Sequence, residues 1–130
     1  MNDAPDSPTA APLVLVIDDE PAVRTVIGRL LTKQGFRVLL AGSGQEGIQL
    51  FEANAADIRL VVLDWHLPGI PGERTFDELI ARDPKLRVVL VTGDHNADLG
   101  ANARQSLACM LLKPFTTAEL MLAVNAVLAA

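Results

Sequence analysis

Five short apolar runs, each followed by a stretch with helical spacing, constrain the fold of this chain most. The runs are rich in Leu and Val with little polar alternation, which is typical of parallel strands covered on both faces. They are Leu13–Ile17, Phe36–Ala41, Leu60–Leu63, Leu86–Val91 and Cys109–Leu112. This alternation predicts an α/β fold, a (βα)5 doubly wound sheet of five parallel strands with right-handed crossovers.

Most of the helices expected between these runs have readable ends. Pro21 stands near the first position of the first helix, and Gly35 is expected to stop it. The second helix should begin after Ser43, which has a glutamate three residues later, the spacing of a capping box. Thr116 and Glu119 repeat this spacing before the fifth helix, and the third is centred on an apolar stripe.

The fourth helix is expected to be marginal. Its segment, "NADLGANARQ" at residues 96–105, contains a glycine and only one large apolar side chain, Leu99. A helix with so little to bury gains little from packing, so we expect this region to be able to move.

The length of 130 residues and the composition indicate one soluble globular domain, with no apolar run near the roughly 20 residues that span a bilayer. We expect residues 1–12 to be a disordered tail or linker and residues 13–130 to be the domain. A net charge of −5 without a Lys/Arg cluster argues against direct nucleic-acid binding. The single cysteine, Cys109, and the lack of a recognisable leader favour the cytoplasm.

Polar side chains gather where the predicted strands end. Asp18 and Asp19 follow the first run, Asp64 follows the third, Thr92 the fourth and Lys113 the fifth. Because ligands of open α/β sheets bind beyond the carboxyl ends of the strands, these side chains should share one cleft.

The charges in this cleft predict its ligand. Three carboxylates and one ammonium leave a net charge of −2, which one divalent cation would neutralise, and an all-oxygen site favours Mg²⁺. Magnesium, a lysine and a hydroxyl together suit a phosphoryl group. Asp64 stands singly at the end of a central strand and is the best candidate nucleophile, giving an aspartyl phosphate.

Four short segments carry a family resemblance: "VIDDEP", "VVLDWHLPGIPG", "VLVTG" and "LLKPF". In this order and at these distances, they make residues 13–128 resemble a bacterial response-regulator receiver domain of two-component signalling. The resemblance implies a flavodoxin-like strand order, 2-1-3-4-5. It also implies that the protein is a phosphoacceptor and not a turnover enzyme, with slow self-phosphorylation from small donors and self-dephosphorylation.

The resemblance further assigns the site. Asp64 would take a phosphoryl group from the phosphohistidine of a histidine kinase or phosphotransfer protein. Asp19 and Asp64 would bind Mg²⁺ directly, Asp18 chiefly through water, and the backbone carbonyl of His66 would be a further ligand. The His66 side chain is expected to be an exposed loop residue without a metal role, yet to influence the rate of phosphate hydrolysis.

The switch is also implied by the resemblance. Thr92 and Lys113 would contact the phosphoryl oxygens, and the Lys113–Pro114 bond is expected to be cis. Movement of Thr92 would reshape the surface of the fourth helix, fifth strand and fifth helix, which is also a candidate homodimer interface. Met110 occupies the position where the family usually has an aromatic residue, so the usual ring rotation is unavailable.

Three alternatives stay open at this stage. A small Mg²⁺-dependent phosphohydrolase would also use an aspartyl phosphate, a flavodoxin-like protein would bind a cofactor, and a degenerate receiver would act only as an interaction module. The downstream target is unknown. The chain ends just after the fifth predicted helix, so we expect either a stand-alone regulator or a receiver from a longer protein such as a hybrid histidine kinase.

Overall fold

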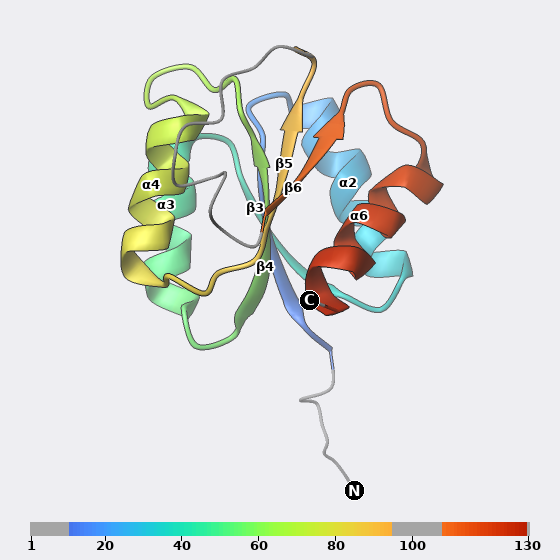
Figure 1. The fold of residues 1–130 in the computed structure, drawn as a ribbon, viewed down its shortest axis with the longest axis horizontal. Helices are drawn as coiled ribbons and strands as arrows, with labels where there is room; N and C mark the ends of the chain where they lie inside the picture. Colours follow the sequence, from blue (N-terminus) through green and yellow to red (C-terminus); the bar gives the residue numbers. More distant parts are fainter. Residues whose placement is uncertain (1–10, 95–107, 130) are drawn as a thin grey trace, which may run out of the picture.

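Five parallel strands form the centre of the protein (Figure 1). The computed structural model describes residues 11–94 and 108–129. Neighbouring strands all pair in parallel, in the order β3-β2-β4-β5-β6. Counted along the chain this is the order 2-1-3-4-5, which confirms the predicted doubly wound sheet. The strands are β2 (Leu13–Ile17), β3 (Arg37–Ala41), β4 (Ile58–Asp64), β5 (Val88–Thr92) and β6 (Ala108–Leu112).

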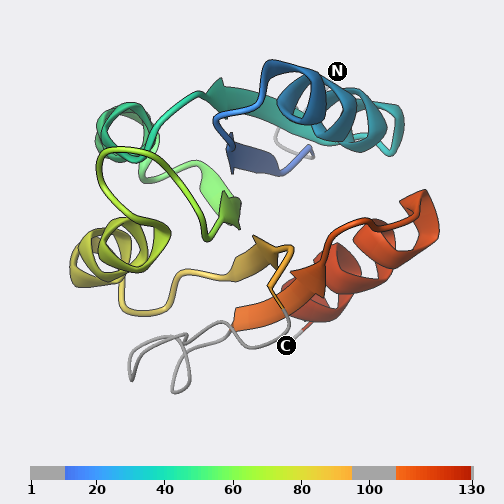
Figure 2. The same cartoon turned by 90° about the horizontal axis from the view of Figure 1, so that it is seen from above.

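The described helices cover both faces of the sheet (Figure 2). One face carries α2 (Pro21–Lys33) and α6 (Thr117–Ala129), and the other carries α3 (Gly44–Asn54) and α4 (Gly72–Arg82). Alternate side chains of β2 enter two separate cores, because Leu15 packs on the α3–α4 side and Val16 on the α2–α6 side. All five residues of β2 are buried, as expected of a strand covered on both faces.

Local signals set the helix starts. Pro21 occupies the first position of α2. The Ser43 hydroxyl accepts a hydrogen bond from the Glu46 N–H at 3.1 Å, and Glu46 accepts one from Gly42. At α6, Thr116 and Glu119 form both bonds of a capping box, at 2.8 and 3.1 Å.

The strand boundaries differ slightly from those predicted. Leu86 is buried but precedes β5, and the Phe36 N–H donates to Leu31 O, closing the end of α2 instead of extending β3. Conversely, β4 begins at Ile58, which pairs with Leu13, and continues through Asp64. Burial alone therefore does not mark a strand end, because loop residues also enter the core.

Two predictions concern segments outside the described residues. The marginal fourth helix falls within 95–107, and most of the expected tail falls within 1–10. Among the helices that the structure does describe, none combines the length and apolarity needed to cross a membrane.

Candidate phosphoacceptor and metal site

Backbone hydrogen bonds continue beyond the strands and fix the start of each loop at the carboxyl edge of the sheet. The Asp18 N–H donates to Ala41 O at 3.1 Å, and the Trp65 N–H donates to Val91 O at 2.8 Å. The Lys113 N–H likewise donates to Thr92 O at 2.8 Å. The residues at these loop starts are therefore held by the sheet itself, not by flexible connections.

Three carboxylates meet at this edge, as predicted. One oxygen each from Asp18, Asp19 and Asp64 lies within 4.8 Å of the other two. Ligand bonds of about 2.0–2.1 Å place the oxygens of an octahedral Mg²⁺ site about 2.9 Å apart at adjacent positions and about 4.2 Å apart at opposite ones, so the cluster would close around the ion or bind it partly through water. The donor set is all-oxygen and mostly buried, and it fits a hard divalent cation.

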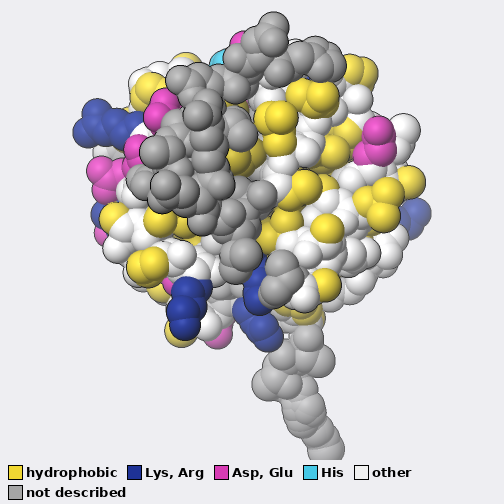
Figure 3. Space-filling model, in the orientation of Figure 1, with side chains coloured by type: hydrophobic (Ala, Val, Ile, Leu, Met, Phe, Trp, Pro, Cys, Tyr) yellow, Lys and Arg dark blue, Asp and Glu magenta, His cyan; other side chains and the backbone are white. Residues whose placement is uncertain are grey.

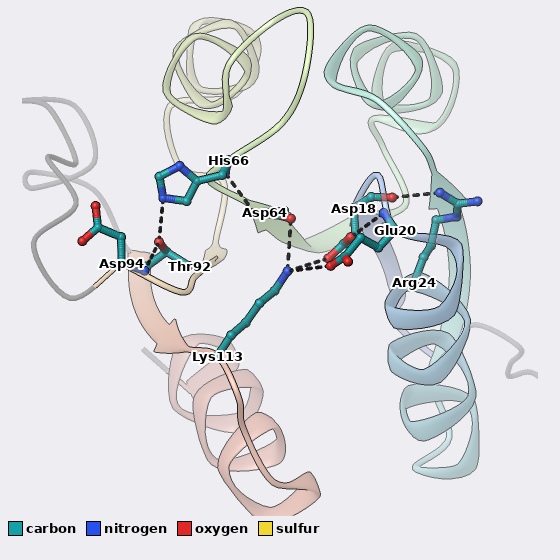
Figure 4. A network of polar contacts seen from close by, with 8 residues as sticks. All are labelled: Asp18, Glu20, Arg24, Asp64, His66, Thr92, Asp94 and Lys113. Atoms are coloured by element: carbon teal, nitrogen blue, oxygen red, sulfur yellow. Dashed lines mark hydrogen bonds and ion pairs between the residues drawn. The ribbon is translucent and has the colours of Figure 1, made fainter.

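Lys113 connects the carboxylates (Figure 4). Its Nζ lies 3.2 Å from Asp64 Oδ2 and 3.4 Å from Asp18 Oδ2. Glu20, which the sequence did not single out, adds a third oxygen at 3.6 Å. Burial lowers the pKa of Lys113, but the charges of Asp64 and Asp18 and the bonds to them outweigh this and raise it. Lys113 is therefore cationic at neutral pH.

Asp18 and Asp19 have different surroundings. Asp18 is 2% exposed, and its Oδ1 accepts a hydrogen bond from the Glu20 N–H at 2.9 Å. Its backbone carbonyl accepts one from Arg24 at 2.8 Å. Burial raises the pKa of Asp18, and the nearby Asp64 charge adds to this, against the opposing effects of the Glu20 N–H and Lys113. Within the described part of the chain, the partly exposed Asp19 carboxylate has no hydrogen-bond or ion-pair partner.

Asp64 is the last residue of β4 and is 4% exposed. Its two oxygens have different partners, because Oδ1 accepts the His66 N–H at 3.0 Å while Oδ2 faces Lys113. The loop after Asp64 then turns back, and the Gly72 N–H at the start of α4 donates to Trp65 O at 3.1 Å. The acceptor carboxylate is thus held between a backbone donor and an ammonium group.

Thr92 lies at the same edge but bonds away from the carboxylates. It is fully buried, and its Oγ1 lies 3.0 Å from Nε2 of His66 and accepts the Asp94 N–H at 3.0 Å (Figure 4). His66 is exposed, as predicted, but the contact of its ring with Thr92 was not anticipated. The only feature of the sequence that pointed to His66 was its position two residues after Asp64.

Two further predictions concern the region around β6. The Lys113–Pro114 peptide bond is cis, as expected. Met110 lies on β6 and is 41% exposed, so in this structure its side chain lies largely at the surface.

Residues 14–125 match the family model of the response regulator receiver domain. The chain belongs to this family. The residues that the four sequence segments predicted for the site lie where β2, β4, β5 and β6 end, at the carboxyl edge of the sheet.

Known proteins resemble this receiver domain in sequence and in structure. The transcriptional regulatory protein AfsQ1 of Streptomyces coelicolor is 41% identical over 81 residues, which cover 62% of this chain and 35% of AfsQ1. A response regulator receiver domain protein from Clostridium thermocellum has a TM-score of 0.83 and 31% identity, covering 91% of this chain and 94% of that one.

A third similar protein was crystallised with ligands. The response regulator TrrA from Thermotoga maritima, in complex with Mg²⁺ and beryllofluoride, has a TM-score of 0.80 and 25% identity, covering 89% of this chain and 98% of TrrA. The receiver domain spans half or less of the length of the first curated relatives that it matches.

Proposed function

We propose that Asp64 accepts a phosphoryl group from the phosphohistidine of a histidine kinase or a phosphotransfer protein. One observation carries this proposal: a single buried carboxylate ends a central strand between two other acids and a lysine. The full set of acidic, hydroxyl and ammonium side chains argues against a degenerate receiver. Family membership favours a signalling phosphoacceptor over a small phosphohydrolase or a flavodoxin-like cofactor binder.

The chain's own residues suit this transfer. A carboxylate oxygen of Asp64 would form the new O–P bond while the P–N bond of the donor breaks, and the electron pair returns to the imidazole nitrogen of the donor. Lys113 lies 3.2 Å from Asp64 and remains cationic, so it is placed to balance the charge of the phosphoryl oxygens. Burial of Asp64 limits access of bulk water to the reacting atoms.

The acidic cluster is proposed to hold Mg²⁺. Asp19 and Asp64 would bind the ion directly, Asp18 chiefly through water, and the backbone carbonyl of His66 would complete the protein ligands. Bound there, Mg²⁺ would supply positive charge to the phosphoryl oxygens. The Mg²⁺–beryllofluoride complex of TrrA, a protein of the same fold and 25% identical, supports the binding of Mg²⁺ but not the choice of individual ligands.

The signal is proposed to leave through β6 and α6. Hydrophobic side chains gather on the side of the molecule drawn in Figure 3. Met110 of β6 is 41% exposed and Leu122 of α6 is 71% exposed. Thr92, at the end of β5 beside β6, would couple the phosphoryl group to this face. We propose that a partner protein docks here, with a second copy of the receiver as the first candidate. We also propose that the receiver acts in the reducing cytoplasm.

Tryptophan fluorescence tests the phosphoacceptor role. Trp65 is the protein's only tryptophan, is 6% exposed and follows Asp64 directly, so its emission should respond when beryllofluoride and Mg²⁺ occupy the site. The response should disappear in Asp64→Asn. It should persist in Asp57→Asn, which changes an exposed carboxylate next to the opposite end of β4. An equal response in Asp64→Asn would overturn the assignment.

A further inference from the structure

One polar contact of the site has no part in the proposed phosphotransfer. Nε2 of His66 lies 3.0 Å from Oγ1 of Thr92, although the two residues are 26 positions apart. The His66 ring is exposed at the surface, while the Thr92 side chain is fully buried. The ring therefore covers the hydroxyl from the solvent side.

The bonding capacity of the hydroxyl makes this contact consequential. A threonine hydroxyl has one hydrogen to donate and two lone pairs to accept with. The Asp94 N–H uses one lone pair of Thr92 Oγ1 at 3.0 Å. In one tautomer of His66, Nε2 accepts a hydrogen bond from the Thr92 hydroxyl. In the other, the Nε2–H donates to the second lone pair of Oγ1. In both tautomers His66 takes one bonding position of Oγ1, so a bond from Oγ1 to a phosphoryl group on Asp64 would compete with this contact.

His66 is also tied to the acceptor itself. Its backbone N–H donates to Asp64 Oδ1 at 3.0 Å, while its side chain reaches Thr92 on the neighbouring strand. One residue thus contacts both the proposed acceptor and the proposed switch. An exposed ring fills no part of the core, so its removal should leave the fold intact.

We infer that His66 is a positioning residue that holds Thr92 in the unphosphorylated arrangement. This inference rests on the proposed function, since it concerns how Thr92 reaches a phosphoryl group on Asp64. Binding of the phosphoryl group selects the Thr92 position near Asp64, and the bond to His66 opposes this selection. A single hydrogen bond of typical net strength corresponds to a bias of about two- to tenfold.

Beryllofluoride affinity measures this bias. Titration in the presence of Mg²⁺, followed by ¹⁹F NMR, avoids any change in Trp65 emission caused by a substitution next to it. His66→Ala should bind beryllofluoride about two- to tenfold more tightly than the wild type. His66→Gln, whose amide reaches about as far as Nε2, should restore an affinity close to that of the wild type.

A second readout separates positioning from a merely structural role. In the free protein, His66→Ala should move the Thr92 methyl resonance toward its beryllofluoride-bound position, and His66→Gln should not. In a Thr92→Val background, His66→Ala should leave the beryllofluoride affinity unchanged, because the partner hydroxyl is gone.

Three results would overturn the inference: unchanged or weaker affinity in His66→Ala, an unmoved Thr92 resonance, or an equal gain in the Thr92→Val background. These results would leave the proposed function standing if the wild type binds beryllofluoride and Asp64→Asn does not. Absence of binding in the wild type would overturn both.

Discussion

Asp18 and Asp19 are neighbours in the chain, but their carboxylate oxygens differ in their hydrogen-bond and ion-pair partners. Asp18 is buried and engaged by the Glu20 N–H and by Lys113, whereas Asp19 is partly exposed and has no partner among the described residues. A carboxylate whose lone pairs are unused is better placed for direct metal ligation. The structure therefore gives a physical reason for the unequal roles proposed for the two acids.

Magnesium affinity should follow this difference. Asp18→Asn should weaken Mg²⁺ binding about tenfold, the lower end of the range for groups that act one step from a metal. Asp19→Asn should weaken it further, because a direct charged ligand is lost. Trp65 fluorescence during Mg²⁺ titration measures both constants. Equal losses in the two variants would undo the assignment of direct and water-mediated ligands.

The pKa of Asp18 predicts a pH dependence of stability without metal. Because this pKa is raised in the folded protein, the folded state retains a proton that the unfolded state has already lost above the ordinary value of 3.8. The Asp18 contribution to the free energy of unfolding therefore falls as pH rises from 3.8 through the raised pKa.

The Asp18→Asn variant has no titratable carboxyl group at this position and should lack this pH dependence. In chelator, the difference in unfolding free energy between the variant and the wild type should shift in favour of the variant as pH rises through that window. Urea unfolding at a series of pH values measures the difference. A difference that stays constant with pH would show that Asp18 has no raised pKa.

At the scale of elements, the sequence was sufficient to predict helices and strands wherever local interactions determine them. Capping boxes at Ser43 and Thr116, and apolar runs buried on both faces, act over a few residues and predict where helices and strands lie. Strand ends then predict which side chains share an edge. The bond between His66 and Thr92 was not predictable in this way, because it depends on how the loop after β4 lies against the end of β5.

The packing of α4 on the loop after Asp64 was equally hidden in the sequence. Gly72, the first residue of α4, lies so close to Trp65 that a Cβ at this position would overlap its backbone. The glycine is needed for this close approach, which holds residues 65 and 66 beside the proposed acceptor. The start of a helix thereby positions part of the site.

Gly72→Ala should consequently lower both stability and beryllofluoride affinity. Overpacking of this kind costs about 1–3 kcal/mol of unfolding free energy, and displacement of residue 66 should disturb its bond to Asp64. Gly28→Ala, inside α2, is a matched control because the added methyl meets only side-chain atoms, of Val38 and of the 40% exposed Leu40, and no backbone. The control should be neutral or stabilised by up to about 1 kcal/mol. Wild-type stability and affinity in Gly72→Ala would exclude a positioning role for this contact.

At the scale of the whole molecule, the proposed site and the proposed output face lie on connected elements. Thr92 ends β5, and the neighbouring strand β6 runs into Lys113. Met110 of β6 and Leu122 of α6 are both exposed apolar side chains. A change at the carboxyl edge of the sheet therefore has a short route to this face. A partner protein that responds to the phosphoryl group would contact exposed side chains such as Met110 and Leu122.

Beryllofluoride should promote self-association through this face. Light scattering coupled to gel filtration should show a larger molecular mass with beryllofluoride and Mg²⁺ than without them. Leu122→Ser should reduce the increase, because it removes a 71% exposed apolar side chain from α6. Val26→Ser, at a 54% exposed site on α2, should not. An increase that is insensitive to Leu122→Ser would place the contact elsewhere.

The central claim is that Asp64, and no other acid of the cluster, receives the phosphoryl group. The most direct measurement is to modify the protein with acetyl phosphate and Mg²⁺, reduce the acyl phosphate with borohydride and locate the resulting homoserine by peptide mass spectrometry. Homoserine should appear at residue 64 and should be absent after omission of Mg²⁺. Homoserine at residue 18 or 19 instead, or no modification at residue 64, would contradict the claim.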